Sequence, residues 1–319
     1  MAHSCPLAKV KKMTSKNPKS NLEIVFFGTG QTSLEALQSL SEEFDIKLVV
    51  TKPPAMNSAG KEFKNSVHEW AQNNNLKIIT PSNKTEMIDL ISNHKLQHCL
   101  GIVLDYGMII PREAIDYFKL GILNSHFSLL PKYRGSNPIR AAILAGDDTT
   151  GVTIIKITPG LDDGPILSWA EIDLDNMDSL KLRNKLSELN CALLNETIKL
   201  YASGELELID QDDSEITHTT KTTKEDGLFD PTKDAERLYR ETLAYAGWPK
   251  SYLVHNGNNL IITKARPSKI KVTPSKLEVI NNKLHYGCKN GSLVLDQVQP
   301  AGKAAMEASA FINGYLNKN

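Results

Sequence analysis

The stretch Asn124-Ser125-His126-Phe127-Ser128-Leu129-Leu130-Pro131 follows the apolar run Gly121-Ile122-Leu123 and carries most of the information about this chain. The apolar run predicts a buried strand, and Asn124, Ser125 and His126 follow at its carboxyl end, where open α/β sheets place their ligands. Side chains alternate along an extended chain, so Asn124 and His126 are expected to point the same way. An amide and an imidazole would then face one pocket.

A second polar turn follows another predicted strand. The run Gly151 to Ile157 is rich in β-branched residues, which favours a strand, and it leads into Thr158-Pro159-Gly160-Leu161-Asp162-Asp163-Gly164. We expect this turn to deliver carboxylates to the edge of the sheet. An amide donor, an imidazole and a carboxylate would therefore meet above one pocket.

These motifs together resemble the signature of the folate-dependent formyltransferases, which is Asn-x-His, then Ser-Leu-Leu-Pro, then a Leu-Asp-x-Gly loop. All three parts are present, as Asn124 and His126, as Ser128 to Pro131, and as Leu161 to Gly164. A lone histidine or a turn aspartate is more often structural than catalytic. The combination in this order is what indicates the family.

The resemblance continues beyond this core and covers residues 21–316. Gly247-Trp248-Pro249 and the stretch Gln299 to Met306 are similar to the carboxyl-terminal domain of the family branch that acts on tRNA. The resemblance implies transfer of a formyl group from the co-substrate 10-formyltetrahydrofolate to methionyl-initiator tRNA, with no metal. It also implies a cytoplasmic translation-initiation enzyme, and nothing predicts an obligate protein partner.

Formyl transfer requires hydrogen-bond donors aimed at the oxygen on which negative charge develops, and a path for the proton of the attacking amine. The resemblance assigns the catalytic roles to Asn124, His126 and Asp162. Asn124 supplies an uncharged N–H donor, and His126 supplies a second donor and a proton for the leaving nitrogen. Asp162 would orient His126, favour its charged form and help move the amine's proton. Asp163 is the less suitable carboxylate by its place in the family pattern.

The resemblance assigns folate binding to Ser128, Leu129, Leu130 and Pro131, a rigid turn whose backbone groups would grip a flat heterocycle. The structural alternative for this turn is a buried apolar connection that ends in proline. A serine nucleophile is not indicated, because no Gly-x-Ser-x-Gly sequence surrounds Ser128.

The composition limits the classes of protein that need to be considered. The chain has 319 residues, of which 40% are hydrophobic and 23% charged, as in ordinary soluble globular proteins with room for two domains. No apolar run reaches the roughly 18 to 20 residues that a membrane helix requires. The cysteines form no CxxC pair and indicate neither a zinc site nor a disulfide framework; they are Cys5, Cys99, Cys191 and Cys288.

The first domain is predicted over residues 21–204 as an α/β fold with a doubly wound, mostly parallel, Rossmann-like sheet. Ile24 to Phe27, Gly28-Thr29-Gly30 and the following helical pattern resemble the start of a Rossmann unit. A third glycine is missing, and no acidic residue follows the next strand, so dinucleotide binding is not expected. We interpret Gly28 and Gly30 as structural.

The remaining chain is divided into a basic flexible arm over residues 1–20, a linker over 205–225 and a carboxyl-terminal domain over 226–319. Short alternating runs after Trp248 predict a small OB-like β-barrel. The net charge of the whole chain is zero, yet the region from Thr217 onward carries about six excess positive charges. A basic stretch within it predicts tRNA phosphate contacts without base specificity, through Lys264, Arg266, Lys269, Lys271 and Lys276.

Between the second and third predicted strands lies a long loop, residues 51–64. Loops of this length are either functional or merely tolerated. In the family this insertion approaches the tRNA acceptor end, and the candidate phosphate contacts here are Lys52, Lys61 and Lys64.

Four alternatives compete with the tRNA interpretation. A glycinamide ribonucleotide formyltransferase lacks a carboxyl-terminal domain of this kind, and a formyltetrahydrofolate hydrolase-like protein lacks the asparagine that Asn124 supplies. A non-catalytic tRNA-binding protein would not need the complete triad. A sugar-nucleotide N-formyltransferase is the closest competitor, since it can carry a second domain, although its product would need no basic barrel.

Overall fold

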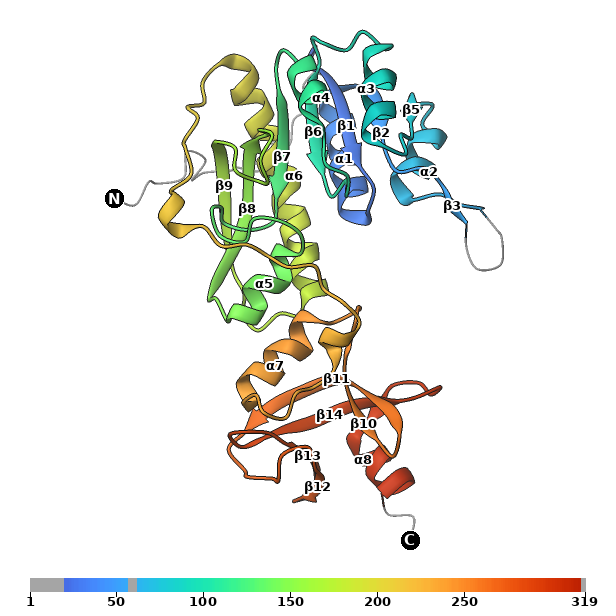
Figure 1. The fold of residues 1–319 in the computed structure, drawn as a ribbon, viewed down its shortest axis with the longest axis vertical. Helices are drawn as coiled ribbons and strands as arrows, with labels where there is room; N and C mark the ends of the chain where they lie inside the picture. The colour runs from blue at the N-terminus through green and yellow to red at the C-terminus, as the bar shows by residue number, and fades with distance from the viewer. Residues whose placement is uncertain (1–19, 57–61, 317–319) are drawn as a thin grey trace. The chain divides into compact units, whose positions relative to one another are not determined.

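A computed structural model describes residues 20–56 and 62–316 (Figure 1). Lys61 lies outside the described residues. The predicted basic arm, except for Ser20, also lies outside them. The described chain forms two compact units. The first unit comprises the residues up to Gly135 together with Thr150–Ile172 and Arg183–His218. The second comprises Ser136–Thr149, Asp173–Leu182 and the residues from Thr219 onward.

The first unit is built on a seven-stranded sheet with the strand order β5-β2-β1-β6-β7-β8-β9. The first five strands in this order run parallel, whereas β8 is antiparallel to β7. The mostly parallel sheet expected from the sequence is confirmed. Its strands are β1 (Glu23–Gly28), β2 (Asp45–Val50), β5 (Ile78–Ile79), β6 (Leu100–Leu104), β7 (Ile122–His126), β8 (Thr149–Lys156) and β9 (Ile166–Asp173).

Helices cover both faces of this sheet, and therefore β6 and most of β1 are continuous apolar runs. Phe26 and Phe27 point to opposite faces of β1, and neither is exposed. Gly28 allows a close approach of α1, because a Cβ on it would come within 2.7 Å of the Ser33 Cβ. The helices are α1 (Gln31–Glu43), α2 (Ser66–Asn73), α3 (Lys84–Ser92), α4 (Arg112–Tyr117) and α6 (Ser179–Ser203).

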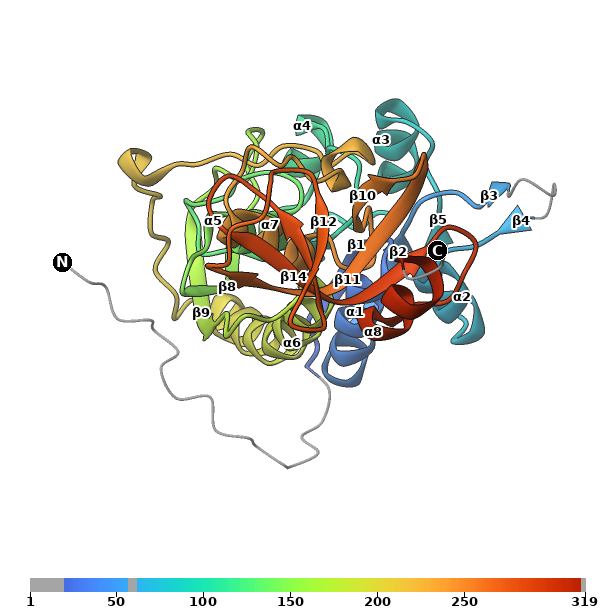
Figure 2. The same ribbon diagram turned by 90° about the horizontal axis from the view of Figure 1, so that it is seen from below.

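The long loop between β2 and α2 contains some regular structure. Its described ends form two short antiparallel strands, β3 (Ala55–Met56) and β4 (Glu62–Phe63), drawn as a narrow ribbon in Figure 2. Met56 and Phe63 expose 68% and 64% of their surface. This ribbon therefore presents apolar side chains to solvent.

The second unit contains a curled antiparallel sheet with the order β10-β11-β14-β13-β12, and β15 pairs with β14. Strands form after Trp248, where the short alternating runs predict them, and the OB-like fold is confirmed. The strands are β10 (Ser251–His255), β11 (Asn258–Ser268), β12 (Leu277–Ile280), β13 (Lys283–Gly287), β14 (Ser292–Pro300) and β15 (Met306–Glu307). The helices are α5 (Pro138–Ala145), α7 (Ala235–Ala244) and α8 (Ala308–Phe311), with a π-helical turn over Ile312–Leu316. A 3₁₀ turn occupies Glu225–Gly227 in this unit, and another occupies Asp213–Glu215 in the first unit.

Helix α7 begins at Ala235 and ends at Ala244. Its start is set by Asp234, whose carboxylate accepts a hydrogen bond from the Arg237 backbone N–H at 2.7 Å. Its apolar side packs against the sheet, with Leu238 fully buried. The capping residue, rather than the apolar period, fixes the boundary.

Candidate active site

The polar residues of the first motif lie within strand β7 and not after it. Asn124 pairs with Val103 of β6 and with Ile155 of β8, and His126 pairs with Thr153. Flanking strands on both sides therefore keep the chain extended through His126. Asn124 and His126 point to the same face of the sheet, as the alternation predicts.

The loop that carries Asp162 reaches this face by a different route from the one expected. Strand β8 runs antiparallel to β7, so that its last residue, Lys156, lies opposite Leu123. The loop after β8 consequently starts beside the first half of β7 and returns across the face of that strand. The three side chains meet, as expected, although the loop reaches them after β8 has run antiparallel to β7.

The Asp162 carboxylate contacts both Asn124 and His126, and these three residues form a polar cluster. Its Oδ1 accepts a hydrogen bond from Asn124 Nδ2 at 3.3 Å, and its Oδ2 accepts one from the Gly135 backbone N–H at 2.8 Å. The same Oδ2 lies 3.5 Å from His126 Nδ1, and the Asp162 side chain is 17% exposed. The backbone of Asp162 is left-handed, with φ of 50°, which aspartate tolerates better than most residues.

His126 is buried, and a polar group faces each of its ring nitrogens. Its Nε2 lies 2.8 Å from the Tyr133 carbonyl oxygen, which can only accept, so Nε2 carries a proton. Nδ1 faces Asp162. The imidazole is thus held between a backbone carbonyl and a carboxylate, a geometry that fixes its orientation.

The carboxylate of the next residue, Asp163, makes a different contact. Asp163 Oδ1 accepts a hydrogen bond from the Thr158 hydroxyl at the start of the same loop. This contact closes the loop on itself. The structure therefore directs Asp162 towards Asn124 and His126, and Asp163 away from them.

The turn Ser128 to Pro131 is held by internal hydrogen bonds. The buried Ser128 hydroxyl donates to the Lys132 carbonyl at 2.6 Å, and Thr153 Oγ1 bridges the Ser128 carbonyl and the Leu130 N–H at 2.7 and 3.1 Å. Leu130 packs with Ile155 and Ile166. These polar groups shape the turn, which contains a cis Leu130–Pro131 peptide bond.

Sequence reasoning missed Gln211, which lies in the stretch interpreted as a linker. Its Nε2 donates to the carbonyl oxygens of Asp162 and Gly164, each at 2.8 Å. Its Oε1 accepts two hydrogen bonds from Arg134, at 3.0 and 2.7 Å. Gln211 thereby joins the Asp162 loop to the segment after the Ser128 turn. A single glutamine among acidic residues gives no sequence signal for this role.

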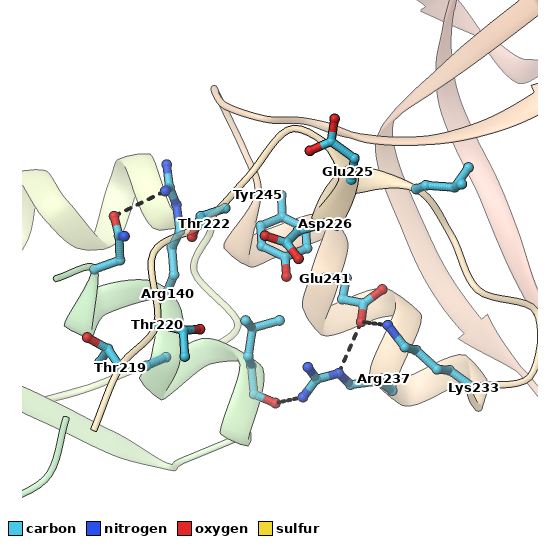
Figure 3. Close-up of a pocket in the computed structure, with 14 residues that line it drawn as sticks. Arg140, Thr219, Thr220, Thr222, Glu225, Asp226, Lys233, Arg237, Glu241 and Tyr245 are labelled. Atoms are coloured by element: carbon cyan, nitrogen blue, oxygen red, sulfur yellow. Dashed lines mark hydrogen bonds and ion pairs between the residues drawn. The ribbon is translucent and has the colours of Figure 1, made fainter. Parts of the chain in front are cut away.

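The second unit holds a polar pocket of about 400 Å³ (Figure 3). The buried carboxylate of Glu241 accepts hydrogen bonds from Lys233 at 2.8 Å and from Arg237 at 3.1 Å. Arg237 also donates to the Leu144 carbonyl of α5 at 2.7 Å. Arg140 lies over the Trp248 ring, with 5.5 Å between the guanidinium carbon and the ring centroid. The charges of Lys233, Arg237 and Glu241 are paired with one another.

The predicted basic stretch lies on and after β11. All five of its side chains are exposed, and Arg266 pairs with Asp296 at 3.1 Å. In the described part of the chain, no group of three or more His, Cys, Asp or Glu side chains is arranged to hold a metal ion. No described helix combines the length and apolarity needed to cross a membrane.

Comparison with known proteins gives consistent results. The formyl transferase profile matches residues 22–198, and the profile of the formyl transferase C-terminal domain matches residues 221–316. The methionyl-tRNA formyltransferase of Chloroflexus aggregans is 36% identical over 92% of this chain and 97% of its own length. The methionyl-tRNA formyltransferase of Thermus thermophilus is 32% identical over 92% of this chain and 96% of its own length.

Solved structures share the fold at lower identity. An N-formyltransferase from Helicobacter canadensis, in complex with folinic acid and dTDP-3-aminofucose, superimposes with a TM-score of 0.66 at 17% identity. The match covers 88% of this chain and 99% of that one. At this identity the likeness concerns the fold alone.

Proposed function

Because the chain belongs to the formyl transferase family, with both of its domains matched, we propose that it is a methionyl-tRNA formyltransferase. In this reaction the formyl group of 10-formyltetrahydrofolate passes to the α-amino group of methionyl-initiator tRNA, giving N-formylmethionyl-tRNA for translation initiation. The single observation that carries the chemistry is the Asp162 carboxylate, which engages Asn124 and His126 on one face of β7. The acceptor follows from the full-length similarity to methionyl-tRNA formyltransferases.

Asn124 is suited to the developing oxyanion. Its amide nitrogen carries two hydrogens, and Asp162 takes one of them. The second N–H is left for the oxygen of the formyl group, where charge grows during attack. Asp162 therefore acts on Asn124 as a positioning residue that fixes the direction of this donor.

His126 supplies the proton for the leaving nitrogen. The imidazole is held by Tyr133 on one side and Asp162 on the other, so that it stands at a fixed place beside Asn124. For proton transfer the Nε2–H must exchange its carbonyl partner for the substrate nitrogen. Such contacts commonly form only in the substrate complex.

Exposed apolar side chains in the loops after β6 and β8 support folate binding. Ile109, after β6, exposes 66% of its surface, and Leu161, beside Asp162, exposes 58%. Large apolar side chains that are this exposed gain stability when a flat heterocycle covers them. The turn Ser128-Leu129-Leu130-Pro131 is proposed to contribute to this site as a rigid wall.

The tRNA would be held by basic and apolar groups of both units. The exposed lysines of the stretch from Lys264 to Lys276 are proposed to contact phosphates. Lys52 and Lys64 are the described candidates beside the β3–β4 ribbon. The exposed Met56 and Phe63 of that ribbon offer stacking surfaces for unpaired bases.

The proposed organisation is a catalytic domain over residues 21–204, a linker over 205–225 and a tRNA-binding domain over 226–319, in a cytoplasmic enzyme. The similarity to a solved sugar N-formyltransferase structure leaves one competing acceptor, an amino-sugar nucleotide. Formylation of methionyl-initiator tRNA should be measured beside that of an amino-sugar nucleotide. Transfer to the tRNA supports the proposal, and transfer to the sugar alone overturns it.

A further inference from the structure

A second carboxylate, Asp105, stands at the carboxyl edge of the sheet next to the catalytic strand. Val103 pairs with Asn124 in parallel register, so Asp105, two residues later, is level with His126. Neighbouring strands lie roughly 4.8 Å apart. On the other side, Leu104 pairs with Gly28, which places Asp105 beside the turn between β1 and α1.

The backbone at Asp105 turns its side chain out of the strand direction. Its φ is 46°, a left-handed conformation that is uncommon for residues other than glycine and that often occurs at functional sites. The carboxylate is directed towards Gly30, since a Cβ on that glycine would come within 2.7 Å of Asp105 Oδ2. The side chain remains exposed to solvent. It is thus accessible from the edge where the sheet ends.

The hydrogen-bonding states of Asp105 and Asp162 differ. Asp162 accepts hydrogen bonds from Asn124 and Gly135 and faces His126, so its lone pairs are used to hold those partners. Among residues 20–56 and 62–316, no hydrogen bond or ion pair reaches the Asp105 carboxylate. The formyl transfer reaction needs a group that takes the proton of the attacking amine, and Asp105 has lone pairs available for it.

We propose that Asp105 binds the attacking amine of the acceptor and accepts its proton. This inference rests on the proposed function, because it names a residue of the same reaction. As the new N–C bond forms, the N–H electron pair stays on nitrogen and the proton passes to Asp105. The bond between the formyl carbon and the folate nitrogen then breaks, and that nitrogen takes a proton from His126. Solvent exchange returns both side chains to their starting states.

The electrostatic surroundings agree with this role. The Asp105 side chain reaches solvent, yet the surrounding protein removes part of its hydration; this partial desolvation raises the pKa of Asp105 above its usual value and makes the carboxylate a stronger base than an ordinary aspartate. Arg183 of α6 and Lys52 after β2 oppose this rise. His126, on the adjacent strand, is the other titratable group at the same level.

The decisive variants are Asp105→Asn and Asp105→Glu. Asparagine tolerates the left-handed backbone as well as aspartate does, and therefore it removes the base without disturbing the fold. Glutamate keeps a carboxylate in a shifted position. Asp116→Asn on helix α4, whose partner Arg112 is also exposed, is the matched control. For each protein we would measure kcat and KM for the acceptor between pH 5 and 9, and tetrahydrofolate affinity by fluorescence titration.

We expect Asp105→Asn to lower kcat/KM for the acceptor about 100-fold at neutral pH, while Asp105→Glu recovers part of the loss. The ratio of the wild-type rate to the Asp105→Asn rate should shrink as the pH falls through the pKa of Asp105, because the protonated wild type also lacks a base. This ratio cancels the titration of the amine and of His126. Tetrahydrofolate affinity should not change.

Three results would overturn the inference. They are an Asp105→Asn rate within twofold of wild type, a rate ratio that does not vary with pH, and a loss of tetrahydrofolate affinity that accounts for the loss of rate. If the wild type formylates only an amino-sugar nucleotide, the proposed acceptor is wrong. The same comparison is then made with that amine, because either acceptor must lose a proton.

Discussion

Gln211 donates hydrogen bonds to the backbone of the loop that presents Asp162, with 2.8 Å from its Nε2 to the Asp162 carbonyl oxygen. A side chain 49 positions away in the sequence thus fixes the loop at its left-handed residue. The bonds hold the backbone and leave the Asp162 carboxylate free to meet Asn124 and His126. Gln211 is therefore a positioning residue that touches no reacting atom.

Replacing Gln211 with alanine should lower kcat about tenfold and leave KM for the acceptor nearly unchanged, because a misplaced carboxylate weakens stabilisation of the transition state. Hydrogen exchange of residues 158–164 should become faster in the variant. Asn73→Ala, which removes an exposed amide on helix α2, is the control. An unchanged exchange rate in that loop would show that Gln211 does not restrain it.

The two adjacent carboxylates provide a matched pair. Asp162→Asn should lower kcat at least 100-fold, because the group that orients both Asn124 and His126 loses its charge. Asp163→Asn should cost less than tenfold, since Asp163 accepts its hydrogen bond from Thr158 within the loop and not from Asn124. Both rates are measured in single-turnover formyl transfer. A larger loss for Asp163 would reverse the assignment.

The basic stretch after β11 should act through phosphate contacts. Replacing Lys269 and Lys271 with alanine should weaken tRNA binding and make the slope of log affinity against log salt shallower by roughly 1 to 2. Filter binding from 50 to 300 mM salt measures this slope. Lys84→Ala with Lys95→Ala, on and after α3, is the double control. Equal slopes for both double variants would remove this face from the tRNA site.

The buried carboxylate of the second unit should matter for folding. Glu241→Gln should destabilise this unit by about 3 kcal/mol, because Lys233 and Arg237 lose the charge that they share. Urea unfolding followed by circular dichroism measures the change. Glu236→Gln, at an exposed position of the same helix, is expected to stay within about 0.5 kcal/mol of wild type. Equal effects of the two substitutions would contradict the pairing.

His285 predicts a pH effect on stability. Burial, helped by Arg266 and Lys283, lowers the pKa of His285 in the folded state. The neutral form is favoured on folding, so its contribution is present above the unfolded pKa of about 6.5 and is lost as the pH falls from there towards the folded pKa. His285→Asn should flatten the loss of unfolding free energy in this acidic range. The exposed His98→Asn should leave it as in wild type.

The sequence predicted much of the architecture, because both sheets follow local apolar patterns. The run Ile24 to Phe27 and the short strands after Trp248 appear close to where the residues indicate. The meeting of Asn124, His126 and Asp162 was also predicted, through ordered motifs. The direction of β8 was not, since strand direction depends on pairing and not on composition.

Contacts between segments that are distant in sequence were beyond sequence reasoning. Gln211 acts only because residues 205–218 return to the catalytic loop, where the Ile209 backbone pairs with Ile166. Asp105 follows an ordinary apolar strand, and its place beside His126 appears only from the register. In both cases the residue type is common, and only its position in the fold indicates a role.

Because the Asp162 loop returns across β7, the number of residues in the loop determines where the Asp162 carboxylate lies. One residue inserted between Lys156 and Asp162 would let the carboxylate move by up to about 3.3 Å, the rise of one extended residue. That displacement equals the length of the hydrogen bond to Asn124. The loop should therefore tolerate substitutions more readily than insertions or deletions. Natural or engineered variants are expected to keep its number of residues.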